Sequence, residues 1–249
     1  MTQPTSLQTG RYAIRYEVSR DPCGVLLLAV DNKMAGREVM IRQLSDGLSA
    51  GQMQRIAQLN HSTLPSVYDL FDEGGHRYLV TEHPVGQSLA DIALGPRLKE
   101  GTVIAWMRQI AQGLSYLHTQ RPPIAHGDLR PDNIILQDGR RIKMIGGWPA
   151  GCGSMPPSRY AAPEQISGGE PSPSADVYAL GAILHHLLTN IDPNTQPLMA
   201  FAPPDVRRPD LSPTTSAAIV RALSQQPAQR FPSVDAFLQA LTAGGSDQS

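Results

Sequence analysis

Cysteine is scarce in this chain: two residues among 249 are too few for a disulfide framework. Chains poor in disulfides are typical of reducing compartments, so we expect a cytoplasmic protein. No apolar run approaches the ~18 residues of a membrane span, and the first residues lack the charged-then-apolar pattern of a signal peptide. The net charge of −1 gives no basic surplus. We therefore expect no nucleic-acid partner and no membrane insertion of this chain.

Lysine is also scarce, because only Lys33, Lys99 and Lys143 occur among the 21 basic residues. The long stretch between Lys33 and Lys99 therefore contains no lysine. A binding site in that stretch that requires a lysine ammonium group could use only arginine instead. The two side chains are not interchangeable at a site shaped for one of them.

The first third of the chain has the short apolar runs and turn residues of a β-rich segment. Predicted strands cover residues 12–18, 24–30, 37–44, 65–71 and 77–82, and one helix is predicted at 50–60.

From Thr102 to His118 the apolar residues follow the helical period, with Thr102 as the predicted cap. Asp138-Gly139 between two apolar runs predicts a tight hairpin turn. Further helices are predicted at 175–189, 213–225 and 233–243, the last capped by Ser233. A strand-rich part followed by a helical part predicts an α+β protein with two lobes.

Four motifs carry a family resemblance. HGDLRPDN at 126–133 resembles the catalytic loop of the protein kinases, His-Arg-Asp-Leu-Lys-Pro-x-Asn. RYAAPEQ at 159–165 is similar to the end of their activation segment, and ADVYALG at 175–181 to the start of their large C-lobe helix. LVTEHPVGQSL at 79–89 resembles their hinge. In order and spacing the chain resembles the protein kinase superfamily, with the bacterial serine/threonine kinases nearest.

The resemblance implies a two-lobed protein kinase fold, with a β-rich N-lobe that carries one helix and a mainly helical C-lobe. It implies one kinase-like domain over residues 12–243. Its expected parts are an N-lobe at 12–83, a hinge at 82–86 and a C-lobe at 87–243, with disordered ends at 1–11 and 244–249.

Three residues match structural positions of the family. The resemblance implies that Asp176 hydrogen-bonds to the catalytic-loop backbone and that Glu164 pairs with Arg230. Both interactions indicate a folded C-lobe and carry no information about activity.

The phosphate-binding loop departs from the family pattern. Ser19, Asp21 and Gly24 stand where three glycines are expected, although glycine is what lets backbone amides approach a phosphate closely. Asp21 adds a negative charge, and Pro22 removes an amide donor. This loop is unsuited to a polyphosphate.

The lysine and glutamate of the N-lobe are also replaced. Arg42, in VMIR, occupies the position of the phosphate-binding lysine, and Gln52 occupies that of its glutamate partner. No glutamate occurs between Glu38 and Glu73, so no shift of alignment restores the ion pair.

The metal-binding aspartate is missing. Gly146 stands at its position, and the first acidic residue after Asp138 is Glu164. Magnesium prefers carboxylate oxygens together with phosphates, so Asn133 alone is a poor ligand set. In the adenine pocket, Pro84 has no N–H to offer at the hinge, and Met40 replaces a small alanine. The degenerate nucleotide-site positions are Gly24, Arg42, Gln52, Glu82, Pro84 and Gly146.

Asp128, the family's catalytic base, and Asn133 are retained as vestigial catalytic residues. One interpretation is residual catalysis, and the other is that both hydrogen-bond within a loop that the fold requires. We favour the second, since a base alone adds only ~10²–10⁴-fold. Gly127 replaces an arginine that receives an activation-loop phosphate in many kinases, which argues against that form of control. The pairs Arg140-Arg141 and Arg207-Arg208 are interpreted as solvated loop charges.

The sequence predicts a catalytically inactive kinase-like domain, a pseudokinase, that acts as a regulatory or scaffolding protein-binding module in intracellular signalling. We expect a protein partner, such as an active kinase or another signalling protein, and no cofactor. The alternative is a weak or unconventional ATP-dependent serine/threonine kinase that uses Asp128 as base with ATP and Mg. A third hypothesis is a small-molecule sensor that uses the vacated site without chemistry.

Overall fold

The computed structural model describes residues 5–21, 24–44, 50–146 and 158–243. The chain divides into two compact units, and the boundary falls between Pro84 and Val85. We call them the N-terminal unit and the C-terminal unit and consider each by itself. The predicted α+β composition, with a strand-rich part followed by a mainly helical part, is confirmed.

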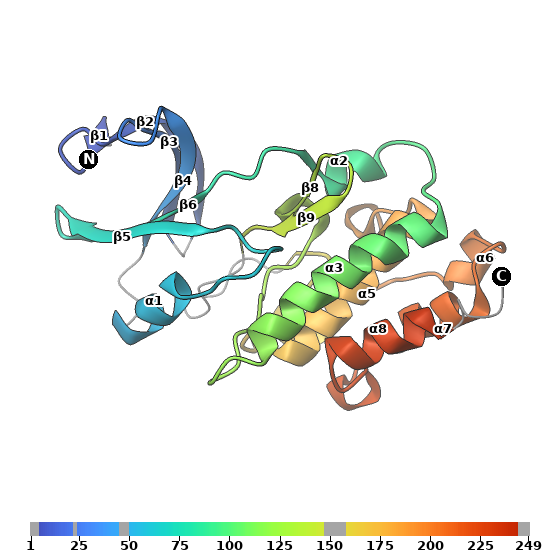
Figure 1. Ribbon diagram of the computed structural model, residues 1–249. Helices are drawn as coiled ribbons and strands as arrows, with labels where there is room; N and C mark the ends of the chain where they lie inside the picture. The colour runs from blue at the N-terminus through green and yellow to red at the C-terminus, as the bar shows by residue number, and fades with distance from the viewer. Residues whose placement is uncertain (1–4, 22–23, 45–49, 147–157, 244–249) are drawn as a thin grey trace. The chain divides into compact units, whose positions relative to one another are not determined.

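The N-terminal unit is built on one antiparallel sheet of six strands, in the order β1-β2-β3-β4-β6-β5 (Figure 1). The elements of this unit are β1 (Ser6–Leu7), β2 (Tyr12–Asp21), β3 (Gly24–Asp31), β4 (Arg37–Leu44), α1 (Ala50–Ala57), β5 (Val67–Glu73) and β6 (His76–Glu82). All five longer strands were predicted, because each is a short apolar run bounded by turn residues. The core on one face of the sheet includes Leu27, Val39, Ile41 and Val80.

The predicted disorder of residues 1–11 is wrong for residues 6–11. Leu7 pairs with Tyr12 and is buried. Arg11 forms two hydrogen bonds to the fully buried carboxylate of Asp31 and one to Asp69. A buried carboxylate needs a paired charge, so Arg11 fixes the segment to the sheet. Residues 1–4 and 244–249 lie outside the described residues.

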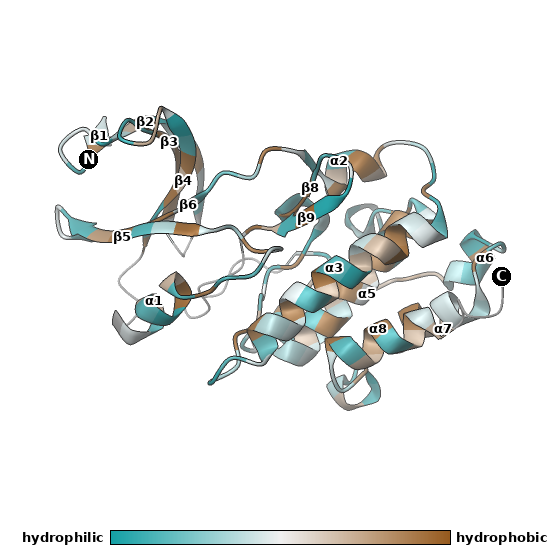
Figure 2. Cartoon of the chain, viewed as in Figure 1, coloured by the Kyte–Doolittle hydropathy of each residue, from teal (hydrophilic) through white to brown (hydrophobic). Residues whose placement is uncertain are grey.

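The C-terminal unit is mainly helical. Its elements are β7 (Gln87–Ser88), α2 (Leu89–Ala93), α3 (Glu100–His118), η1 (Pro131–Asn133), β8 (Ile134–Gln137), β9 (Arg141–Met144), α4 (Pro163–Ile166), α5 (Pro173–Thr189), η2 (Pro193–Thr195), α6 (Pro204–Arg207), α7 (Pro213–Ala222), η3 (Pro227–Gln229) and α8 (Val234–Thr242). Helices α3 and α5 lie side by side, and α8 packs on α3 (Figure 1). Their apolar stripes, brown in Figure 2, form the core.

Helix α5 is buried along almost its whole length. Gly181 allows α7 to approach it closely, because a Cβ at this position would lie 2.7 Å from the Cβ of Ala222. Ser233 caps α8 as predicted, accepting a hydrogen bond from the Ala236 N–H. The predicted Thr102 cap is wrong: α3 begins at Glu100, and the Thr102 N–H already bonds to the carbonyl of Lys99.

The predicted pair of Glu164 and Arg230 is confirmed. The two guanidinium nitrogens of Arg230 donate to the two carboxylate oxygens of Glu164 at 2.6 and 2.7 Å. The Arg230 side chain is fully buried and also donates to three backbone carbonyls. Burial alone would raise the pKa of Glu164, but the hydrogen bonds from Arg230 outweigh it and lower that pKa. Removing one partner of such a pair costs about 3–5 kcal/mol.

The C-terminal unit also contains three buried histidines, His126, His185 and His186. Burial lowers the pKa of each ring, because the charged form loses its hydration. Both ring nitrogens of His126 are buried and have no hydrogen-bond partner in the described part of the chain. Each ring is therefore held neutral, and the unfolded chain binds protons more readily than the folded one.

Acid should consequently destabilise the fold, and His126→Met should weaken this dependence. A folded-state pKa below the unfolded value gives stability that is present above pH ~6.5 and lost as the pH falls. Removing one such histidine should reduce the slope by up to about 1.4 kcal/mol per pH unit. Urea unfolding at pH 7.5, 6.5 and 5.5 measures this slope. The exposed His76 provides the control, since His76→Gln should leave the slope unchanged; equal slopes for His126→Met and wild type would contradict the assignment.

Candidate functional site

Strand β4 places Met40 and Arg42 on the same face of the sheet. They alternate with Val39 and Ile41, which are fully buried in the core on the opposite face. Arg42 itself is half-buried and lies between Leu26 of β3 and Leu79 of β6. The arginine predicted at the lysine position thus comes from a central strand, with Met40 two residues away on its face.

Gly24 has a packing reason for being glycine. Its φ is +125°, and a Cβ there would lie 1.8 Å from the carbonyl oxygen of Gln43 on β4. The β2–β3 pairing continues to Asp21 and Gly24 themselves. Pro22 lies outside the described residues. Gly24 is therefore required by the sheet whether or not a phosphate binds near it.

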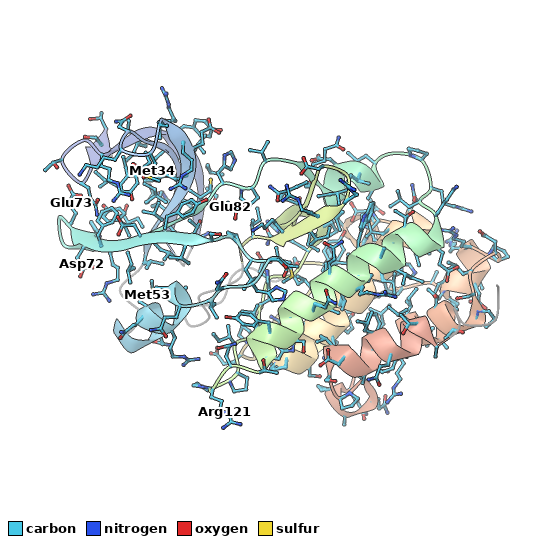
Figure 3. All side chains as sticks on the ribbon, viewed as in Figure 1. Met34, Met53, Asp72, Glu73, Glu82 and Arg121 are labelled. Atoms are coloured by element: carbon cyan, nitrogen blue, oxygen red, sulfur yellow. The ribbon has the colours of Figure 1, made fainter. Side chains whose placement is uncertain are left out.

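Helix α1 does not bury the predicted glutamate position. Gln52 is exposed, whereas its neighbour Met53 is almost fully buried, with Ile56 one turn later (Figure 3). The apolar face of the helix accounts for its packing. Gln52 therefore does not contribute a buried charge, and an amide cannot supply one.

Two hydrogen bonds fix the predicted hinge residue Glu82 to Ser66. The N–H of Glu82 donates to the carbonyl of Ser66 at 2.8 Å, and the Glu82 carboxylate accepts the Ser66 N–H at 3.1 Å (Figure 3). Pro84 is buried and has no N–H. This end of the N-terminal unit therefore lacks the backbone donor expected at the position of Pro84.

Asp176 fixes the catalytic loop in the C-terminal unit, as predicted. Its buried carboxylate accepts the backbone N–H of His126 at 2.7 Å and that of Gly127 at 3.0 Å. A third hydrogen bond, at 2.8 Å, joins it to Nε2 of His118. The loop conformation is thus determined by helix α5 and by the last turn of α3.

Gly127 occupies a position that a side chain does not fit. Its φ is +79°, and a Cβ would lie 2.9 Å from the ring of Pro171. Its carbonyl accepts a hydrogen bond from Gln165 at 2.9 Å. Packing against Pro171 therefore disfavours a side chain at residue 127, where many kinases have the arginine that receives an activation-loop phosphate.

Asp128 and Asn133 hydrogen-bond to each other. The Asn133 Nδ2 donates to the Asp128 carboxylate and to its backbone carbonyl, both at 2.8 Å. The Asp128 side chain is only 13% exposed, and Nε of Arg130 lies 3.9 Å from its carboxylate. These contacts stabilise the loop and engage one oxygen, Oδ2, of the Asp128 carboxylate.

Gly146 packs directly on this pair. With φ at +74°, its hypothetical Cβ would lie 3.1 Å from Nδ2 and 3.3 Å from Oδ1 of Asn133. The Ile145 N–H donates to the Asn133 carbonyl at 2.8 Å. The predicted position of the metal-binding aspartate is thus beside Asn133, but it carries no carboxylate.

These residues do not fit a magnesium ion. Asn133 turns its amide nitrogen toward Asp128, so the side chains beside Gly146 offer one amide oxygen and one carboxylate that is already hydrogen-bonded. Across the described residues, no group of three or more His, Cys, Asp or Glu side chains could hold a metal ion. Magnesium requires near-octahedral oxygen ligands, usually with one or two free carboxylates.

The structure brings together Asp128, Asn133 and Gly146. The other predicted positions, Gly24, Arg42, Gln52, Glu82 and Pro84, belong to the N-terminal unit.

A sequence model of the protein kinase domain matches residues 45–200. The chain belongs to the protein kinase family. Over 255 residues it is 30% identical to serine/threonine-protein kinase pkn3 of Myxococcus xanthus, covering 87% of this chain and 46% of that protein. It is 32% identical over 204 residues to inactive serine/threonine-protein kinase PLK5 of Mus musculus, covering 74% and 33%. This kinase domain thus spans a third to about half of the length of these relatives.

Solved kinase structures show the same fold. The crystal structure of the Mycobacterium tuberculosis PknI kinase domain gives a TM-score of 0.70 at 24% identity, over 97% of this chain and 99% of that one. Rad53 residues 1–466 in complex with AMP-PNP give 0.75 at 21% identity, over 93% and 65%. None of the helices in the described residues is long and apolar enough to span a membrane.

Two features of this kinase domain were not predicted. The hydroxyl of Tyr160 lies 2.7 Å from Nδ1 of His186, and both side chains are buried. Arg208, interpreted as a solvated charge, is instead buried, and it donates to the carbonyls of Leu98 and Leu188. Both features depend on residues distant in sequence. The local sequence around Arg208, which is rich in proline, gave no indication that this side chain is buried.

Gly127→Ala tests whether packing closes the loop at this position. Gly168→Ala is the matched control, because Gly168 has a similar φ of +88° but open space around a Cβ. The control should lose about 1–2 kcal/mol from backbone strain alone. Gly127→Ala should lose a further 1–3 kcal/mol or so from the contact with Pro171. Equal losses in chemical denaturation would show that Pro171 moves aside readily.

Proposed function

We propose that this kinase domain is catalytically inactive, a pseudokinase, and that it acts as a regulatory or scaffolding protein-binding module in intracellular signalling. The observation that carries the proposal is that Asp128 and Asn133 hydrogen-bond to each other beside Gly146, which has no carboxylate. Phosphoryl transfer depends on positioning and on electrostatic stabilisation by metal-borne charge. In the C-terminal unit, the carboxylate beside Asn133 is that of Asp128, which already accepts a hydrogen bond, and residue 146 supplies no carboxylate.

The N-terminal unit supports the same proposal. Arg42 keeps a positive charge on β4, but its planar fork differs in shape and reach from the expected lysine. Gln52 is exposed and uncharged, and the sequence has Asp21 where the resemblance implies a glycine of the phosphate-binding loop. These substitutions all weaken phosphate binding, so we expect no cofactor.

A binding role follows from what the chain retains. The interactions of Asp176 and of Glu164 with Arg230 preserve a folded C-terminal unit, although the catalytic positions have changed. A stable kinase-like surface without phosphoryl transfer is suited to recognising another protein. We expect that partner to be an active kinase or another signalling protein, in the cytoplasm. One relative, PLK5 of Mus musculus, is named an inactive serine/threonine-protein kinase.

The alternative function is a weak or unconventional ATP-dependent serine/threonine kinase. Asp128 is retained at the position of the base, and pkn3 is named as a serine/threonine kinase. Rad53 was solved with the nucleotide analogue AMP-PNP. Under this alternative, ATP and Mg would bind, and the Asp128 carboxylate would accept the proton of the substrate hydroxyl while Asn133 still donates to its Oδ2.

Thermal unfolding with ATP, with and without Mg²⁺ or Mn²⁺, separates the two functions. The proposal predicts no metal-dependent increase in Tm at millimolar ATP. A ligand at 100 times its Kd would add about 2.7 kcal/mol, which corresponds to several degrees for a chain of this size. Such an increase, lost in Asn133→Ala, would establish a metal–nucleotide site and contradict the expectation of no cofactor; inactivity itself is tested by phosphate transfer.

A further inference from the structure

A cluster of basic side chains covers the β8–β9 hairpin and the adjoining part of α3. Arg108, Arg140 and Arg141 are exposed, and Lys143 is half-buried on β9. The hairpin contains one acidic residue, Asp138, and its carboxylate already pairs with Arg141. The cluster therefore keeps a surplus of positive charge in a chain whose net charge is −1.

The hairpin is fixed to α3 by Gln109. The side chain of Gln109 donates to the carbonyl of Arg140 at 2.8 Å and accepts the N–H of Ile142 at 3.0 Å. Arg108 precedes Gln109 on the exposed side of the helix. The backbones that carry Arg108 and Arg140 are thus held near each other. The hairpin is already ordered, so a partner that binds here does not have to order it first.

An exposed apolar residue adjoins the cluster. Val85 is 72% exposed, and its carbonyl accepts a hydrogen bond from Gln137 at 3.3 Å. Gln137 pairs directly with Arg141 across the hairpin. Figure 2 shows hydrophilic, teal stretches on this hairpin. The surface therefore combines one aliphatic side chain with several arginines.

The two outer arginines have no internal role. The side chains of Arg108 and Arg140 make no hydrogen bond, ion pair or ring contact with a residue in the described ranges. An arginine fork binds carboxylates in a bidentate manner, and arginine is enriched in protein interfaces whereas lysine is depleted. The fork also binds phosphate, but the net charge of −1 gives the chain no general attraction to a lipid or nucleic-acid polyanion. A surface of arginines beside one aliphatic residue is therefore better suited to a protein carboxylate.

We propose that Val85, Arg108, Arg140 and Arg141 form a docking surface for an acidic segment of a protein partner. The segment would carry at least two Asp or Glu residues and an aliphatic side chain for Val85. This inference rests on the protein-binding role proposed above and names the chemistry of the partner. Binding of the acidic segment requires neither ATP nor metal. The docking surface and the proposed inactivity are therefore tested by independent experiments.

Selection of a displayed library of random twelve-residue peptides on the full chain tests the docking surface. Enriched peptides should be acidic with one aliphatic residue, and synthetic versions should bind with fluorescence polarisation affinities that weaken with salt. The double variant Arg108→Glu/Arg140→Glu should weaken binding about tenfold or more, because two attractions become repulsions. Val85→Ser should weaken it about threefold.

Matched controls come from the same unit. Arg97→Glu/Arg207→Glu makes the same change in net charge at two exposed arginines, and Val206→Ser removes an equally exposed valine. Both should bind the peptides within twofold of wild type. Enrichment of non-acidic peptides, or equal losses in the two double variants, would overturn the proposal. It would also be overturned if vesicles with one-third phosphatidylserine, or single-stranded DNA, bound with the same arginine dependence while no acidic peptide did.

Discussion

The buried carboxylate of Asp176 determines the shape of the catalytic loop. It accepts two consecutive backbone N–H groups, those of His126 and Gly127, and a ring nitrogen of His118. A carboxylate this deeply buried is stable only with such partners. The interaction in turn places His126 in the core, gives Gly127 its left-handed backbone and leads the chain into Asp128. The loop therefore keeps its form without help from a nucleotide or a metal ion.

If the domain is inactive, as proposed, this explains how the loop motif persists without catalysis. The residues that hold the loop are separate from those that bind phosphate and metal, so the second group can change while the first is retained. Gly146 illustrates the change, because it packs on Asn133 where a carboxylate would be needed. Asp128 then serves as a hydrogen-bond acceptor for Asn133. Retention of Asp128 alone is consequently weak support for catalysis.

Much of the fold was predictable because its signals are local or belong to ordered motifs. The longer strands, the Ser233 cap, the role of Asp176 and the pair of Glu164 with Arg230 followed from such signals. The N-terminal strand and the buried Arg208 did not. For Asp128 and Asn133, hydrogen bonding within the loop was predicted, but not that they bond to each other. Each depends on tertiary contacts or on side-chain rotamers. The Thr102 cap failed because the helix begins two residues earlier, at Glu100, without any side-chain cap.

The most direct test of the central claim is transfer of radiolabelled phosphate from ATP, with Mg²⁺ or Mn²⁺, to the chain itself and to a general protein substrate. Wild type and Asp128→Ala are compared under identical conditions. Both proteins should give the same background incorporation, since residue 146 supplies no carboxylate for a metal ion. Incorporation by wild type at turnover rates of about 1 s⁻¹ or more, abolished in Asp128→Ala, would contradict the central claim.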